Sequence, residues 1–136
     1  MAVSRRPSLN REQKRDLDIE ISFLTGLTRR DPGYVEALQI LGDDYTRRGK
    51  FEEGLQVDLR LAQLRPDDPL AHYNLACSYA LTDRHDAAFA ELNLALDKGY
   101  REFGWLAKDP DLAGFRKHPL YRRLRARIRA LRVEIR

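Results

Sequence analysis

A stretch of the sequence recurs after 34 residues, and this recurrence constrains the fold more than any other feature. Residues 35–66 align with residues 69–100, and several positions carry apolar or small side chains in both copies. The aligned pairs include Ala37 and Ala71, Leu41 and Leu75, Gly42 and Ala76, Tyr45 and Tyr79, Gly54 and Ala88, and Leu61 and Ala95. A period of this length indicates a supersecondary unit that stacks on its neighbour to bury its apolar face.

Each copy has the pattern of two amphipathic helices with a short break between them. In the second copy the break falls at Thr82-Asp83, and small side chains recur wherever two helices would touch. We therefore predict an all-α fold, a short solenoid of antiparallel helix pairs with two full repeats, an N-terminal half-repeat helix and C-terminal capping helices.

The repeated positions resemble a known family. The first copy gives Leu38-x2-Leu41-Gly42-x2-Tyr45 with Gly54 and Pro66, and the second gives His72-x2-Leu75-Ala76-x2-Tyr79 with Ala88-x3-Leu92. This pattern resembles the tetratricopeptide repeat (TPR), in which the small residues allow close helix contact. The resemblance covers about residues 17–125. Three positions depart from it: Asp58 stands where the family has a large apolar residue, Gly54 replaces a better helix former, and Tyr100 replaces the closing proline of the second copy.

The two ends of the predicted array differ from the repeats. Leu17, Ile21, Leu24 and Leu27 have the spacing of a buried helix face, and Asn10 with Gln13 predicts a capping box at its start. At the other end, the run from Gly99 to Leu124 resembles the ending of many bacterial TPR arrays, which implies that Trp105, Leu106, Leu112 and Phe115 cover the last helix face. Pro110 and Pro119 each predict the start of a helix.

We predict one TPR domain over residues 10–136, preceded by a mobile stretch over residues 1–9. Within it, residues 10–30 form the N-terminal helix, 33–66 the first repeat, 67–100 the second repeat, and 101–136 a C-terminal cap with a basic helix. The chain has one cysteine, an N-terminus without an apolar leader, and no long apolar run, so we expect a cytoplasmic protein.

Catalysis is not expected. The three histidines are scattered, the acidic pairs lie largely at expected helix starts, and no histidine is placed to activate Cys77. We predict no enzyme activity, no cofactor and no metal site. The TPR resemblance implies instead a protein-interaction module or scaffold, whose first helices line a groove for a partner segment. The implied lining is Tyr34, Glu36, Gln39, Asp43 and Arg47 from the first repeat and Leu70, Tyr73, Asn74, Cys77 and Leu81 from the second, with Tyr73 and Asn74 at its centre.

The C-terminal segment suggests a second function. Residues 111–136 hold nine basic and two acidic residues. On a helix, Leu120, Leu124, Ile128, Leu131 and Ile135 form one stripe, and Arg122, Arg125, Arg129, Arg132 and Arg136 form another. The basic stripe is either a solvated face or a surface that docks to nucleic acid, an anionic membrane or an acidic partner. Self-association into a homodimer is a third possibility, since a stack of two full units can cover its apolar end with a second copy.

Overall fold

The computed structural model describes residues 8–134, and every regular element in that range is helical. The contacts divide these residues into two compact units, residues 8–66 and residues 67–134, which we call the N-terminal unit and the C-terminal unit. The boundary falls where the sequence predicts the second repeat to begin. Most of the predicted mobile stretch lies outside the described residues.

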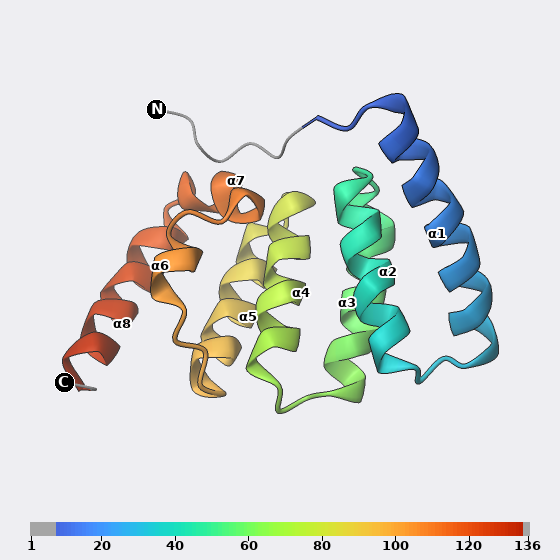
Figure 1. Cartoon of the computed structure of the whole chain (residues 1–136). Coiled ribbons are helices and arrows are strands. Elements are labelled where there is room, and N and C mark those ends of the chain that lie inside the picture. Colours follow the sequence, from blue (N-terminus) through green and yellow to red (C-terminus); the bar gives the residue numbers. More distant parts are fainter. Residues whose placement is uncertain (1–7, 135–136) are drawn as a thin grey trace. The chain divides into compact units, whose positions relative to one another are not determined.

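The N-terminal unit consists of α1 (Arg11–Arg30), α2 (Val35–Arg47) and α3 (Phe51–Leu64), packed in chain order (Figure 1). The predicted capping box is confirmed: the Gln13 backbone N–H donates to Asn10 Oδ1 at 2.8 Å, and the Asn10 backbone N–H donates to Gln13 Oε1 at 2.9 Å. Leu17, Ile21 and Leu24 are buried as predicted, while Leu27 is half-buried.

The C-terminal unit begins with the helix pair α4 (Pro69–Leu81) and α5 (His85–Asp97). These helices start 34 residues after α2 and α3, so the helix bounds confirm the period that the sequence predicts. The all-α class and the arrangement in adjacent helix pairs are confirmed as well.

The turn inside each pair also repeats. Gly49 (φ 82°) and Asp83 (φ 58°) occupy equivalent positions, and both have left-handed backbone conformations. The next amide reaches back across the helix end in each case: the N–H of Lys50 donates to Tyr45 O, and the N–H of Arg84 donates to Tyr79 O, both at 2.8 Å. Asp83 adopts this conformation at a cost that glycine does not have.

Asp58, the departure from the apolar pattern, lies inside the N-terminal unit with 8% of its surface exposed. A Cβ placed on Gly42 would lie 3.1 Å from Asp58 Oδ1 and 3.3 Å from Val57 Cγ1. The carboxyl group therefore fills the space beside a glycine. The equivalent position in the second repeat pairs Ala76 with Leu92, both fully buried.

The cap consists of α6 (Phe103–Leu106), the 3-10 helix η1 (Pro110–Leu112), α7 (Ala113–Arg116) and α8 (Leu120–Glu134). The predicted helix starts at Pro110 and next to Pro119 are confirmed. Leu106, Leu112 and Phe115 are buried as predicted, but Trp105 is 48% exposed and the prediction that it covers a helix face is wrong. Its neighbours Phe103 and Leu106 fill that space instead, because they point to the buried side of the short helix.

Candidate functional site

The predicted groove residues of the first repeat lie on the open side of α2. Glu36, Gln39, Asp43 and Arg47 are exposed, and Tyr34, which immediately precedes the helix, is 40% exposed. Ala37, Leu38 and Leu41 on the other side of α2 belong to the core. The helix therefore presents an exposed face of mostly polar side chains, which also includes the apolar Ile40, 48% exposed.

Tyr73 and Cys77 do not line an open groove. They are 4% and 6% exposed, and both belong to the core of the C-terminal unit. The Tyr73 hydroxyl donates to Asp109 Oδ2 at 2.6 Å, and its ring stacks on Tyr100 at 4.3 Å between centroids. The prediction that these two side chains are open to a partner is wrong because the segment after α5 folds back and covers them.

The remaining predicted residues of α4 are accessible. Asn74 and Leu70 are exposed, the latter by 55%, and Leu81 is half-buried. The predicted groove residues of α2 are therefore exposed, whereas on α4 only Leu70 and Asn74 are exposed and Leu81 is half-buried. Contact of these residues with a partner stays a prediction.

The buried polar cluster of the C-terminal unit has a packing role. Asp109 caps η1: its Oδ1 accepts the backbone N–H of Asp111 at 3.0 Å, while its Oδ2 accepts the Tyr73 hydroxyl and lies 3.7 Å from Cys77 Sγ. Burial raises the pKa of Tyr73 far above its ordinary value, and it raises the pKa of Tyr100 to about 12. Donor atoms of Cys77, Asp109 and Asp111 lie within 4.8 Å of one another. Both oxygens of Asp109 already accept hydrogen bonds. We therefore infer that the cluster holds the cap in place against α4.

All three histidines lie in the C-terminal unit, and two of them are in contact: the ring centroids of His85 and His118 lie 5.0 Å apart. His72 Nδ1 lies 2.8 Å from Glu91 Oε1, where the first repeat has the apolar pair Leu38 and Val57. His118 Nδ1 accepts the backbone N–H of Leu120 at 3.1 Å, which places the proton of a neutral ring on Nε2. These contacts position helices.

A buried carboxyl group lies in the N-terminal unit. Asp44 is 2% exposed, and its Oδ2 has no hydrogen-bond partner among the described residues. Burial and the neighbouring carboxyl of Glu20 raise the pKa of Asp44 to about 7. The group therefore holds a proton at acidic pH and loses it near neutrality.

The arginines of α8 fall into two groups. Arg127 donates to the backbone oxygen and to Oδ1 of Asn93 and pairs with Asp97, and Arg123 lies over the Phe89 ring, so these two dock α8 onto α5. The predicted stripe residues Arg122, Arg125, Arg129 and Arg132 are exposed. Arg136 lies outside the described residues. The apolar stripe packs as predicted within residues 120–134: Leu124 and Ile128 are buried, and Leu120 and Leu131 are partly buried. Its last member, Ile135, also lies outside the described residues.

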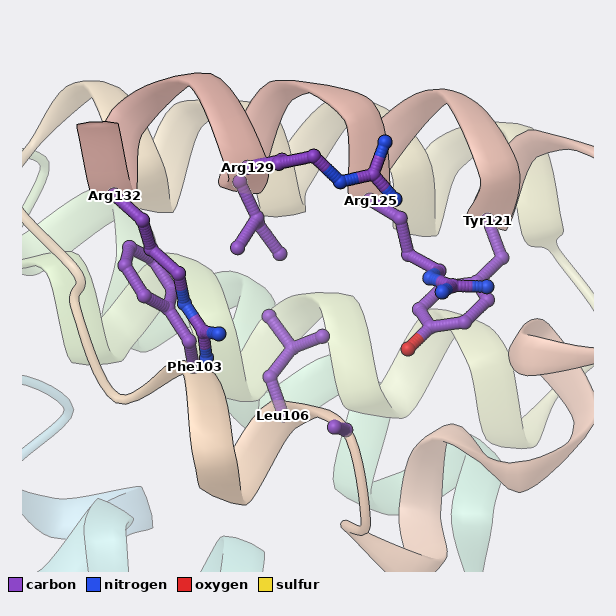
Figure 2. A pocket seen from close by; sticks show the side chains of 8 residues that line it. Phe103, Leu106, Tyr121, Arg125, Arg129 and Arg132 are labelled. Carbon is purple, nitrogen blue, oxygen red and sulfur yellow. The ribbon is translucent and has the colours of Figure 1, made fainter. Parts of the chain in front are cut away.

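A cavity of about 220 Å³ lies between α6 and the exposed arginines of α8. Figure 2 shows Leu106 pointing from α6 toward α8, between two arginine–aromatic pairs. Arg132 lies 5.3 Å from the centroid of the Phe103 ring, and Arg125 lies 5.8 Å from that of Tyr121. Ala107, Ile128 and Arg129 complete the wall, and no carboxylate from residues 8–134 lines the cavity.

Sequence reasoning missed several residues that shape this unit. Asp109 and Tyr100 hold the cap over α4, Phe103 forms one end of the cavity, and Arg127 fixes α8. The Asp-Pro-Asp sequence at 109–111 was a usable signal for Asp109, since aspartate before proline is a frequent helix cap. No local sequence pattern indicates which residues Tyr100 and Arg127 contact.

No helix in the described residues has the length and apolar character needed to cross a membrane.

Comparison with known proteins gives a partial relationship. No family model matches the sequence. The chain is 33% identical over 79 residues to a chloroplastic protein of Arabidopsis thaliana, and the similarity covers 56% of this chain and 24% of the plant protein. This chain therefore matches about a quarter of that relative's length. The similarity to the plant protein is confined to those 79 residues.

Proposed function

We propose that the chain is a non-catalytic interaction module of the TPR type, which holds a segment of a partner protein and serves as a scaffold or assembly factor. A cytoplasmic location is part of this proposal and rests on the single cysteine of the sequence. The observation that carries the proposal is the open face of α2, where Glu36, Gln39, Asp43 and Arg47 are exposed beside Tyr34.

The polar chemistry of the C-terminal unit supports a module without catalysis. Cys77, its one thiol, lies buried against Asp109, and Tyr73 donates its hydroxyl to the same carboxylate. A nucleophile needs access to substrate and a base to activate it. These groups serve instead to hold the cap over α4.

A charge-reversal comparison tests this proposal. The wild-type chain, an α2 variant (Glu36→Arg with Asp43→Arg) and an α8 variant (Arg125→Glu with Arg129→Glu) would each be used for affinity capture from nuclease-treated lysate of the native host. We expect a discrete protein that the wild type and the α8 variant retain at low and high salt and that the α2 variant loses. Equal capture by wild type and α2 variant would contradict the proposal.

Docking of α8 to a polyanion is the second candidate, favoured by the exposure of Arg122, Arg125, Arg129 and Arg132. Binding of this kind falls steeply with salt because counterions are released from the polyanion. With nuclease omitted, the same capture would retain a polyanion that disappears in the α8 variant and at high salt.

A further inference from the structure

The cavity between α6 and α8 combines features that neither a core gap nor a plain basic face has. Leu106 and Phe103 at its base are 1% and 7% exposed, and Ile128 is 9% exposed, so the base is apolar and fixed in the core. Arg125, Arg129 and Arg132 form its rim and are all exposed. An occupant must therefore match an apolar base and a positive rim.

The rim arginines are partly held in place before any ligand binds. The guanidinium groups of Arg132 and Arg125 lie over the rings of Phe103 and Tyr121, at opposite ends of the cavity (Figure 2). Stacking of this kind reduces the side-chain entropy that a new contact would cost. None of the three rim arginines forms an ion pair with another described residue, so their charge is available to an anion.

The size of the cavity sets the size of the apolar part of the ligand. Its volume is about 220 Å³. For comparison, an engineered apolar cavity of about 150 Å³ holds a benzene molecule. The space therefore suits one large apolar side chain, such as phenylalanine or leucine.

We propose that this cavity is a binding site for an acidic peptide segment that carries one large apolar side chain. The apolar side chain enters between Leu106 and Ile128, and carboxylates on either side of it pair with Arg125, Arg129 and Arg132. Bidentate pairing with carboxylates is the interaction that arginine makes most readily. This inference shares with the proposed function only the idea of a protein partner, because its surface is separate from the α2 face.

The apolar base favours a peptide over a polyanion. A nucleic acid or a sulfated polysaccharide would pair with the arginines but would leave the space beside Leu106 and Ile128 unfilled. An acidic peptide with an apolar side chain fills both parts of the site. Its affinity should therefore depend on the apolar residue as well as on the charge.

Binding of defined probes to the purified full chain tests the inference. The probe is a short fluorescein-labelled peptide of aspartate and glutamate around a central phenylalanine, measured by fluorescence anisotropy. A second peptide has alanine in place of the phenylalanine, and single-stranded oligo-dT serves as the polyanion. We expect the alanine peptide to bind at least about tenfold more weakly than the phenylalanine peptide, as burial of a phenylalanine side chain predicts.

Variants of α8 locate the site. Arg125→Glu with Arg129→Glu should abolish binding of the phenylalanine peptide. Arg122→Glu is the matched control, because Arg122 is exposed on the same helix and does not line the cavity. It should change the affinity by less than about twofold, as expected of an exposed charge outside the contact. Far-UV circular dichroism and the fluorescence of Trp105, the one tryptophan, check that each variant is folded.

Three outcomes would overturn the inference. Equal binding of the phenylalanine and alanine peptides would show that the apolar base is not used. Equal loss in Arg122→Glu and in the paired variant, together with tight oligo-dT binding, would indicate a general polyanion surface. Absence of binding of the phenylalanine peptide would also contradict the proposal. The same holds if the chain binds no peptide and self-associates instead, which would show as a molecular mass that rises with protein concentration. None of these results bears on the α2 face, which the capture experiment tests separately.

Discussion

Replacing Asp44 by asparagine is expected to remove part of the pH dependence of the free energy of unfolding. The folded state raises the pKa of Asp44 from 3.8 to about 7, mainly because the carboxyl is buried and also because Glu20 lies beside it. The folded protein therefore retains a proton over a pH range in which the unfolded chain has released it. The contribution of this group to stability is largest below its unfolded pKa of 3.8, falls as the pH rises, and levels off above about pH 7.

The size of the effect follows from the shift. A change from 3.8 to about 7 corresponds to at most about 4 kcal/mol, at about 1.36 kcal/mol per pKa unit. Glu20 is exposed, so solvent near the pair lowers this figure, and we expect about 2 kcal/mol. Asparagine keeps the shape of the side chain, and its amide can donate to Glu20. Asp44→Asn should therefore match the wild type near pH 4 and exceed its stability by about 2 kcal/mol near pH 8.

Urea unfolding followed by far-UV circular dichroism at several pH values measures this difference. Groups that titrate equally in both proteins cancel in the comparison. Asp43→Asn is the matched control, since Asp43 is the adjacent residue on α2 and is exposed. A difference between Asp44→Asn and wild type that stays constant from acidic to alkaline pH would refute the reasoning, as would an equal gain in Asp43→Asn.

Three further predictions concern single side chains, each read from urea or thermal unfolding. Tyr73→Phe removes the hydroxyl that donates to the buried Asp109 carboxylate and should cost about 1–3 kcal/mol; no loss would mean that water replaces the hydroxyl. Asp83→Gly relieves a left-handed backbone and should stabilise by about 1 kcal/mol, and a loss would point to a role for the carboxylate. Gly26→Ala places a new methyl group in free space beside α1 and should stabilise the fold by up to about 1 kcal/mol. Gly42→Ala places its methyl group 3.1 Å from Asp58 Oδ1 and should not stabilise the fold; equal gains would contradict this.

The helix architecture could be predicted from local patterns in the sequence. The recurrence after 34 residues gave two helix pairs and the offset between them, because each copy carries its own helix period and its own turn. Asn10 with Gln13 gave the start of α1, and Pro110 and Pro119 gave the starts of η1 and α8. These signals act within a few residues, which is why sequence alone reveals them.

The candidate site depended on contacts between distant residues. The repeat alignment gives Tyr73 and Cys77 groove positions, yet the Tyr73 hydroxyl is held by Asp109, 36 residues further along the chain. No periodic pattern predicts that the cap folds over α4. Which side chains of α4 are exposed therefore depends on the irregular segment that follows α5.

The arginines of α8 illustrate the same limit. Their spacing predicts an exposed stripe, and four members of it are exposed. The docking role of Arg127 depends on Asn93 and Asp97, which belong to another helix. The cavity beside the stripe depends on Phe103 and Leu106, whose four-residue helix has too short a pattern to recognise.

Photocrosslinking from the exposed face of α2 tests whether this helix binds a partner protein. A benzoyl-phenylalanine would replace Gln39 in one version of the chain and Gln56, an exposed position on α3, in another. Each version would be irradiated in lysate of the native host, and the adducts would be identified by mass spectrometry. We expect a discrete protein adduct from position 39 that is absent from position 56. The same adducts from both positions, or none from position 39, would contradict it.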